Sequence, residues 1–126
     1  MTVVINGKRL SVEANAFTLI VYEDRFKGRR LLQDATALLR MTDTEDIPFG
    51  LVARLLWAEL KTADDATPDF YDWLREFSVA DVMEARLPVL EVLAESMITS
   101  KNLKAAARRA GIFRRFSSWL TRRSAD

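Results

Sequence analysis

The alternation of apolar and polar residues at the start of the chain predicts a β-hairpin. Val3 and Ile5 alternate with polar or outward-facing positions, and Leu10 and Val12 resume the alternation after a short break. The break is an Asn-Gly pair at positions 6–7, which supplies the two positive φ angles of a type I′ turn. The two-residue loop places the four apolar side chains on one face. That face needs a cover, because an isolated hairpin is only marginally stable in water.

After the hairpin, apolar residues recur with the 3.6-residue period of helices. A first helix is predicted over residues 15–26, with Asn15 as its N-cap and Gly28 placed to end it in the left-handed conformation. One side of this helix carries Phe17, Ile20, Val21 and Asp24. A second helix is predicted over residues 29–40. A polar break follows, in which Thr44 or Asp46 is a candidate cap for the next helix.

The segment over residues 49–60 is apolar almost all round and predicts a central, buried helix. Residues 78–100 carry a long apolar stripe that starts at Val79. Ser78 and Asp81 have the spacing of a capping box, and Pro88 predicts a kink or break near Arg86. Together these elements predict an α+β, mainly α, fold in which an N-terminal β-hairpin packs on a bundle of about five to seven helices.

Between the central helix and this stripe lies an acidic and aromatic stretch, ADDATPDFYDWLREF, over residues 63–77. A short helix is predicted over residues 68–77, with Thr67 as N-cap and Pro68 at the first helical position. Its apolar stripe is Phe70, Trp73, Leu74 and Phe77, with Tyr71 beside it. The stripe either closes the core over the central helix or forms a docking groove in which Tyr71 and Trp73 are partly exposed.

Charge divides the chain into an acidic body and a basic end. Residues 1–100 contain 11 basic and 17 acidic residues, a net charge of −6, whereas residues 101–126 contain 8 basic and 1 acidic residue, a net charge of +7. Two short helical pieces are predicted in this end, over residues 103–110 and 112–120, separated by Gly111. We therefore expect one domain over residues 1–100 and a basic amphipathic helical tail over residues 101–126.

The basic tail has three interpretations. Its apolar face can dock on the body with the arginines in water, it can bind a nucleic acid or a membrane surface, or it can dock only in a complex with a partner. The acidic body makes nucleic acid unlikely, because its net charge would repel a phosphate backbone.

Composition excludes much of enzyme chemistry. The 126 residues include no Cys and no His, which removes thiol catalysis, histidine acid-base chemistry and the usual zinc ligand sets. The acids at positions 64, 65, 69 and 72 are ordinary for a helix start, and no glycine-rich phosphate loop accompanies them. We expect no catalytic residue, no cofactor and no metal. Neither a signal peptide nor a membrane span is apparent, so we expect a soluble, cytoplasmic protein.

Residues 1–103 resemble the tail assembly chaperones of long-tailed, siphovirus-type phages and prophages. The resemblance rests on VVINGKRLSVE, NAFTLIVYEDRFKGRRLLQD, LVARLLWAELKTADD, PDFYDWLREF and ESMITSKN in this order. The most telling pieces are residues 17–26, 57–65 and 71–77. The basic end, RRFSSWLTRRSAD, departs from the pattern.

The resemblance implies a non-enzymatic role. Members of this family bind the tape measure protein, keep it soluble and help the tail tube protein polymerise round it. They act in the cytoplasm of the bacterial host and are normally absent from the finished virion. A partner with repeated sites also favours a homo-oligomer.

Our hypothesis is that partner-binding residues lie in two places. They are Phe70, Tyr71 and Trp73 in the aromatic stretch, and Phe113, Arg114, Arg115, Phe116 and Trp119 in the tail. The alternative is a small helical regulatory or nucleic-acid-binding protein that acts through its basic C-terminal tail.

Overall fold

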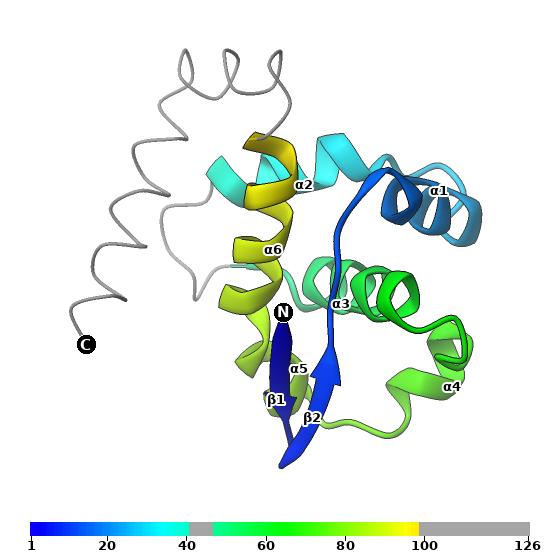
Figure 1. The fold of residues 1–126 in the computed structure, drawn as a ribbon, viewed down its shortest axis with the longest axis vertical. Helices are drawn as coiled ribbons and strands as arrows, with labels where there is room; N and C mark the ends of the chain where they lie inside the picture. The colour runs from blue at the N-terminus through cyan, green and yellow to red at the C-terminus, as the bar shows by residue number, and fades with distance from the viewer. Residues whose placement is uncertain (41–46, 99–126) are drawn as a thin grey trace, which may run out of the picture.

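The computed structural model describes residues 1–40 and 47–98. Within these residues it contains a two-stranded antiparallel hairpin followed by six helices (Figure 1), which confirms the predicted mainly α fold. The elements are β1 (Thr2–Ile5), β2 (Lys8–Ser11), α1 (Ala16–Arg25), α2 (Leu31–Arg40), α3 (Phe49–Ala63), α4 (Phe70–Leu74), α5 (Val79–Glu84) and α6 (Arg86–Ile98). The predicted tail, residues 101–126, lies outside the described residues.

The hairpin forms as its sequence predicts. Val3 pairs with Leu10, and the two turn residues at positions 6 and 7 have φ angles of 52° and 75°. Val3, Ile5 and Val12 are buried in the core, while Leu10 is half-buried against it. The cover that the hairpin needs comes from α3 and α5, which contact β2 and β1 respectively.

Helix α3 is the centre of the fold, and α1, α4, α5, α6 and the hairpin all pack on it (Figure 1). Its nearly uniform apolar sequence fits this position, because a helix surrounded by other elements has little polar surface to present to water. The N-cap position is occupied by Pro48, and no side chain caps the helix. The predicted caps, Thr44 and Asp46, therefore do not occupy the N-cap position, and they lie outside the described residues.

The inward side of α1 differs from the side that its apolar pattern favoured. Thr18 and Tyr22 are buried, whereas Phe17 and Ile20 are 53% and 59% exposed. The polar atoms on the inward side have partners, which lowers the cost of burying them. The Thr18 hydroxyl lies 2.8 Å from the hydroxyl of Thr62 on α3 and accepts a bond from the backbone of Asn15, the predicted N-cap.

Helix α4 is shorter than predicted and starts later. Asp69, rather than Thr67, occupies its N-cap position. The Thr67 hydroxyl instead donates to the carbonyls of Leu60 and Asp64 at the end of α3, at 3.2 and 2.7 Å. The Trp57 indole donates to the Pro68 carbonyl at 2.8 Å. The residues before α4 are thus occupied in closing the end of α3.

The long stripe over residues 78–100 divides into α5 and α6 at Ala85, as Pro88 predicts. Pro88 lies in the first turn of α6, where a missing amide hydrogen costs no helical bond. The capping box is confirmed, since the side chains of Ser78 and Asp81 each bond the other residue's backbone amide. Val79, expected on the inward stripe, is exposed, and the buried positions run from Val82 to the second half of α6.

Candidate partner-binding surface

An aromatic cluster joins α1, α3 and α4. Phe26 packs edge to face on Trp57 and on Phe70, with ring centroids 5.6 and 4.9 Å apart. Phe70 is 6.2 Å from Trp73, and Tyr22 is 5.1 Å from Phe26. Edge-to-face aromatic pairs add about 0.5–1.5 kcal/mol to the burial of their apolar area. The cluster is therefore a principal part of the core.

The three sequence-predicted site residues on α4 divide into two groups. Phe70 and Trp73 are only 8% and 3% exposed, so they close the core and do not form an open docking groove. Their spacing of three places both on the inner side of the helix, where Phe70 packs on Trp57 and Phe26 and Trp73 stacks on Phe70. Tyr71 is 61% exposed and is the one member of the three that a partner can reach.

Arg25 holds the exposed Tyr71 ring against the fold. Its guanidinium carbon lies 4.9 Å from the Tyr71 ring centroid and 5.8 Å from that of Phe70. Its Nε also donates to Asp69 Oδ1 at 2.9 Å. This bond raises the pKa of Arg25 and lowers the pKa of the Asp69 carboxyl. We call Arg25, Asp69 and Tyr71 the Arg25 clamp.

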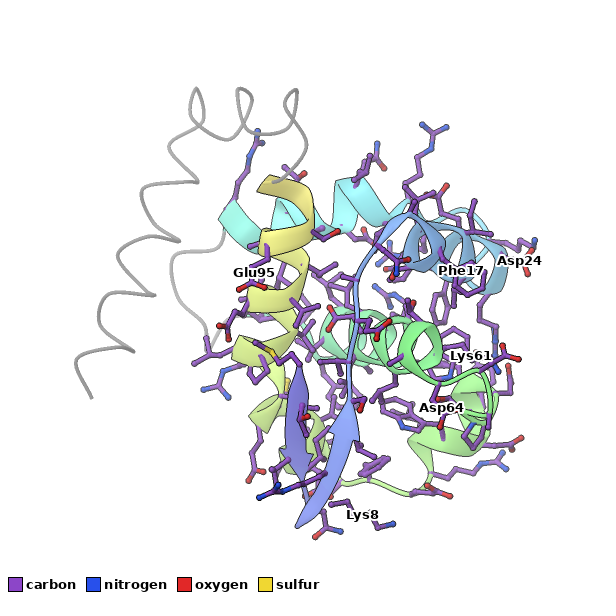
Figure 2. The ribbon with its side chains drawn as sticks, viewed as in Figure 1. Lys8, Phe17, Asp24, Lys61, Asp64 and Glu95 are labelled. Atoms are coloured by element: carbon purple, nitrogen blue, oxygen red, sulfur yellow. The ribbon has the colours of Figure 1, made fainter. Side chains whose placement is uncertain are left out.

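The outer side of α1 continues this surface. Phe17 and Ile20 are three residues apart, so they lie on the same side of the helix, and half-buried Val21 lies beside them. Figure 2 shows Phe17 and Asp24 on α1. Arg25 lies at the edge of this outer side of α1 and packs against Tyr71 on α4. The spacing of these residues in the sequence predicted one apolar side of α1, but it did not predict that this side faces solvent.

A partly buried polar network joins α1, α2 and α3. The Tyr22 hydroxyl donates to Asp34 and accepts a 3.3 Å bond from Arg54 Nε. Arg29 Nε lies 3.5 Å from the same Asp34 carboxylate. Burial and the bond to Asp34 raise the pKa of Tyr22 to about 12. The phenol therefore keeps its proton at neutral pH, which suits a structural donor better than a general base.

Glu59 is the one charged side chain among the described residues that is completely buried. It is 0% exposed, and neither carboxyl oxygen has a hydrogen-bond partner in the described part of the chain. Burial raises the pKa of this carboxyl well above its usual range. It shares the central helix with the core leucines, so it is enclosed in the fold and does not belong to the exposed surface.

The acids of the 64–72 stretch have separate local roles. Asp64 accepts a bond from the Ala66 amide, Asp69 pairs with Arg25, and Asp72 lies 3.8 Å from Arg75. Over residues 1–40 and 47–98, no group of three or more acids is arranged to hold a metal ion. No helix in the described ranges is long and apolar enough to span a membrane.

The sequence-predicted site residues of the tail, Phe113, Arg114, Arg115, Phe116 and Trp119, lie outside the described residues. Comparison with known proteins adds no relative, since no family model, no curated protein and no solved structure matches this chain. The surface formed by Tyr71 and the outer side of α1 therefore has to be interpreted from its own chemistry.

Proposed function

We propose that this protein is a non-enzymatic chaperone that binds an amphipathic helical partner. More specifically, we propose a tail assembly chaperone that binds the phage tape measure protein, keeps it soluble and promotes polymerisation of the tail tube protein. It would act in the cytoplasm of the bacterial host and be absent from the finished virion. The observation that carries the proposal is the exposure of Phe17 and Ile20 on one side of α1, next to the Arg25 clamp.

The chemistry of this surface fits a helical partner. Phe17, Ile20 and Tyr71 offer apolar and aromatic contact area, and large exposed apolar groups commonly mark protein interaction sites. Asp24 and the Arg25–Asp69 pair place charges at the edge of this area. Such a rim can pair with the polar side of an amphipathic helix while its apolar side covers Phe17 and Ile20. A chaperone of this kind acts by mass action, because binding removes the partner from aggregation.

The test is co-expression with the tape measure protein and measurement of the soluble, co-purifying partner. We expect the wild-type chain to solubilise the partner and Phe17→Ser with Ile20→Ser to lose most of this effect. The matched control is Leu32→Ser with Val79→Ser, which removes two exposed apolar side chains from α2 and α5. Equal solubilisation by both double variants would refute the assigned surface.

A different result would favour the alternative function. If the tape measure protein stays insoluble with the wild-type chain, the chaperone proposal fails. Salt-sensitive binding to arbitrary duplex DNA, lost on truncation after residue 100, would then support a nucleic-acid-binding role of the basic tail.

A further inference from the structure

A groove of about 650 Å³ lies between α6 and the connection from β2 to α1. Residues 12–16 line one side, and Val92, Glu95 and Ser96 line the other. Figure 1 shows α6, the N-terminus and this connection around the same region. The volume is within the range of about 300–1,000 Å³ that is typical of protein binding sites. The groove reaches the start of α1 at Ala16, next to Phe17, but shares no lining residue with the partner-binding surface on α1 and α4.

The lining of the groove combines apolar and acidic groups. Val12 and Val92 lie beneath the groove and are almost fully buried. Its accessible apolar lining comes from the exposed side chains of Met1 and Ala16 and from half-buried Ala14. Glu13 and Glu95 are both exposed and contribute carboxylates from the two sides. The Met1 amine is held by the Val12 carbonyl at 3.3 Å. This arrangement suits a ligand with an apolar face flanked by positive charges.

We propose that the groove binds the chain's own C-terminal segment, residues 112–120. This segment, IFRRFSSWL, has aromatic and aliphatic residues with an Arg-Arg pair between them, and residues 101–126 carry a net charge of +7. Its apolar side chains complement the exposed Met1 and Ala16 side chains of the groove. Its arginines complement Glu13 and Glu95 on a body whose net charge is −6.

The chain connection permits this contact. Glu95 and Ser96 line the groove and lie within the last turn of α6, so the described part of the chain ends beside the groove. Residues 99–111 separate α6 from the proposed segment. They span up to roughly 40 Å when extended and about 20 Å when helical, which is enough to return alongside α6. A tether of this length gives an effective concentration near the millimolar range, so a weak contact is sufficient for docking.

Disulfide trapping in the full-length chain tests the contact, and the native chain offers a clean background because it has no cysteine. The test variant combines Ala16→Cys at the groove with Ser118→Cys in the segment. The matched control combines Lys8→Cys with Ser118→Cys. Lys8 lies at the end of the hairpin, far from Glu95 (Figure 2). Bridging within one chain and between chains is separated by mass on non-reducing gels at low protein concentration.

We expect the groove pair to form an intramolecular disulfide at least about tenfold faster than the control pair, because docking raises the local thiol concentration. Adding Glu13→Lys and Glu95→Lys should slow the groove pair by roughly tenfold, since like charges then face the arginines. Both substituted glutamates are exposed, so thermal unfolding should change little. Equal rates for the two pairs, bridging only between chains, or no effect of the lysines would each overturn the proposal.

Discussion

Replacing Glu59 by Leu should stabilise the protein. The carboxyl is completely buried on the central helix, and neither oxygen has a partner among the described residues. A buried polar group without a hydrogen bond costs about 1–3 kcal/mol, whereas a Leu side chain of similar size satisfies an apolar site. We therefore expect Glu59→Leu to increase the free energy of unfolding by about 1–3 kcal/mol even where the carboxyl is neutral.

The stability that Glu59→Leu gains over the wild type should grow with pH. Burial raises the pKa of Glu59 in the folded state. Below the ordinary glutamate pKa, this carboxyl is protonated in both the folded and the unfolded wild-type protein, so its titration costs no stability there. Above that value the unfolded chain loses this proton while the folded chain retains it, and stability falls until the folded pKa is passed. Within this window the advantage of Glu59→Leu grows by up to about 1.4 kcal/mol for each pH unit.

The assay is denaturant unfolding of the wild type and Glu59→Leu at a series of pH values from 5 to 7.5. Without histidine or cysteine, few other side chains titrate in this range, so the difference between the two proteins isolates Glu59. Each kcal/mol corresponds to about 4 °C in Tm for a chain of this size. The thermal shift should therefore be visible in ordinary melting curves.

Two further variants separate protonation from burial. Glu59→Gln retains a buried polar group that cannot titrate. The stability contributed at this position should therefore not depend on pH in this range. The Gln variant should be less stable than Glu59→Leu, because its amide is still buried without a partner. Glu84→Leu, at an exposed position of α5, should change stability by less than about 0.5 kcal/mol at any of these pH values. The reasoning would be refuted by a Glu59→Leu protein that is less stable than the wild type, or whose difference from it does not depend on pH.

Three other predictions can be checked by denaturant unfolding. Trp73→Ala should cost about 3–5 kcal/mol because it opens the aromatic cluster, while Tyr71→Ala should cost less than about 1 kcal/mol; equal losses would contradict their placement. Tyr22→Phe should cost about 1–3 kcal/mol because Asp34 loses the Tyr22 donor, and a neutral effect would argue against the polar network. In the wild type, the stability from protonated Tyr22 should be present below pH 10 and lost as pH rises through about 12, and Tyr22→Phe should not show this loss. Ser78→Ala should cost about 1 kcal/mol and Ser78→Thr much less, provided the capping box acts as described.

The elements that the sequence predicted correctly are those decided by neighbouring residues. The Asn-Gly turn, the Asn15 cap and the box between Ser78 and Asp81 each depend on side chains and backbone within three residues. The central position of α3 follows from apolar residues on every side, which leaves only burial as an option. Local chemistry and a uniform pattern were therefore enough to predict the hairpin, most helix starts and the fold class.

The errors concern side chains whose partners belong to a different helix from the one that the pattern assigned to them. Thr67 caps the end of α3 rather than the start of α4, and its partner Leu60 is not apparent from the TPDF motif. Thr18 turns inward because Thr62 on another helix meets its hydroxyl. A hydrophobicity pattern treats both threonines only as polar residues, so it could not predict which side of α1 faces water. The same limit hid Phe17 and Ile20 as candidates for the binding surface.

Two features of this fold oppose the simple pattern of apolar inside and polar outside, and they have opposite consequences. Glu59 is buried in the core, where we expect it to lower stability, and it offers no surface to a partner. Phe17 and Ile20 face outward on a helix whose inward side is already satisfied by Thr18 and Tyr22, so replacing them should hardly affect folding. Departures from local consistency are expected at functional sites. Under the proposed function, a bound partner would cover the outer side of α1. A Phe17→Ser with Ile20→Ser protein that folds normally but no longer solubilises the tape measure protein would then separate function from stability.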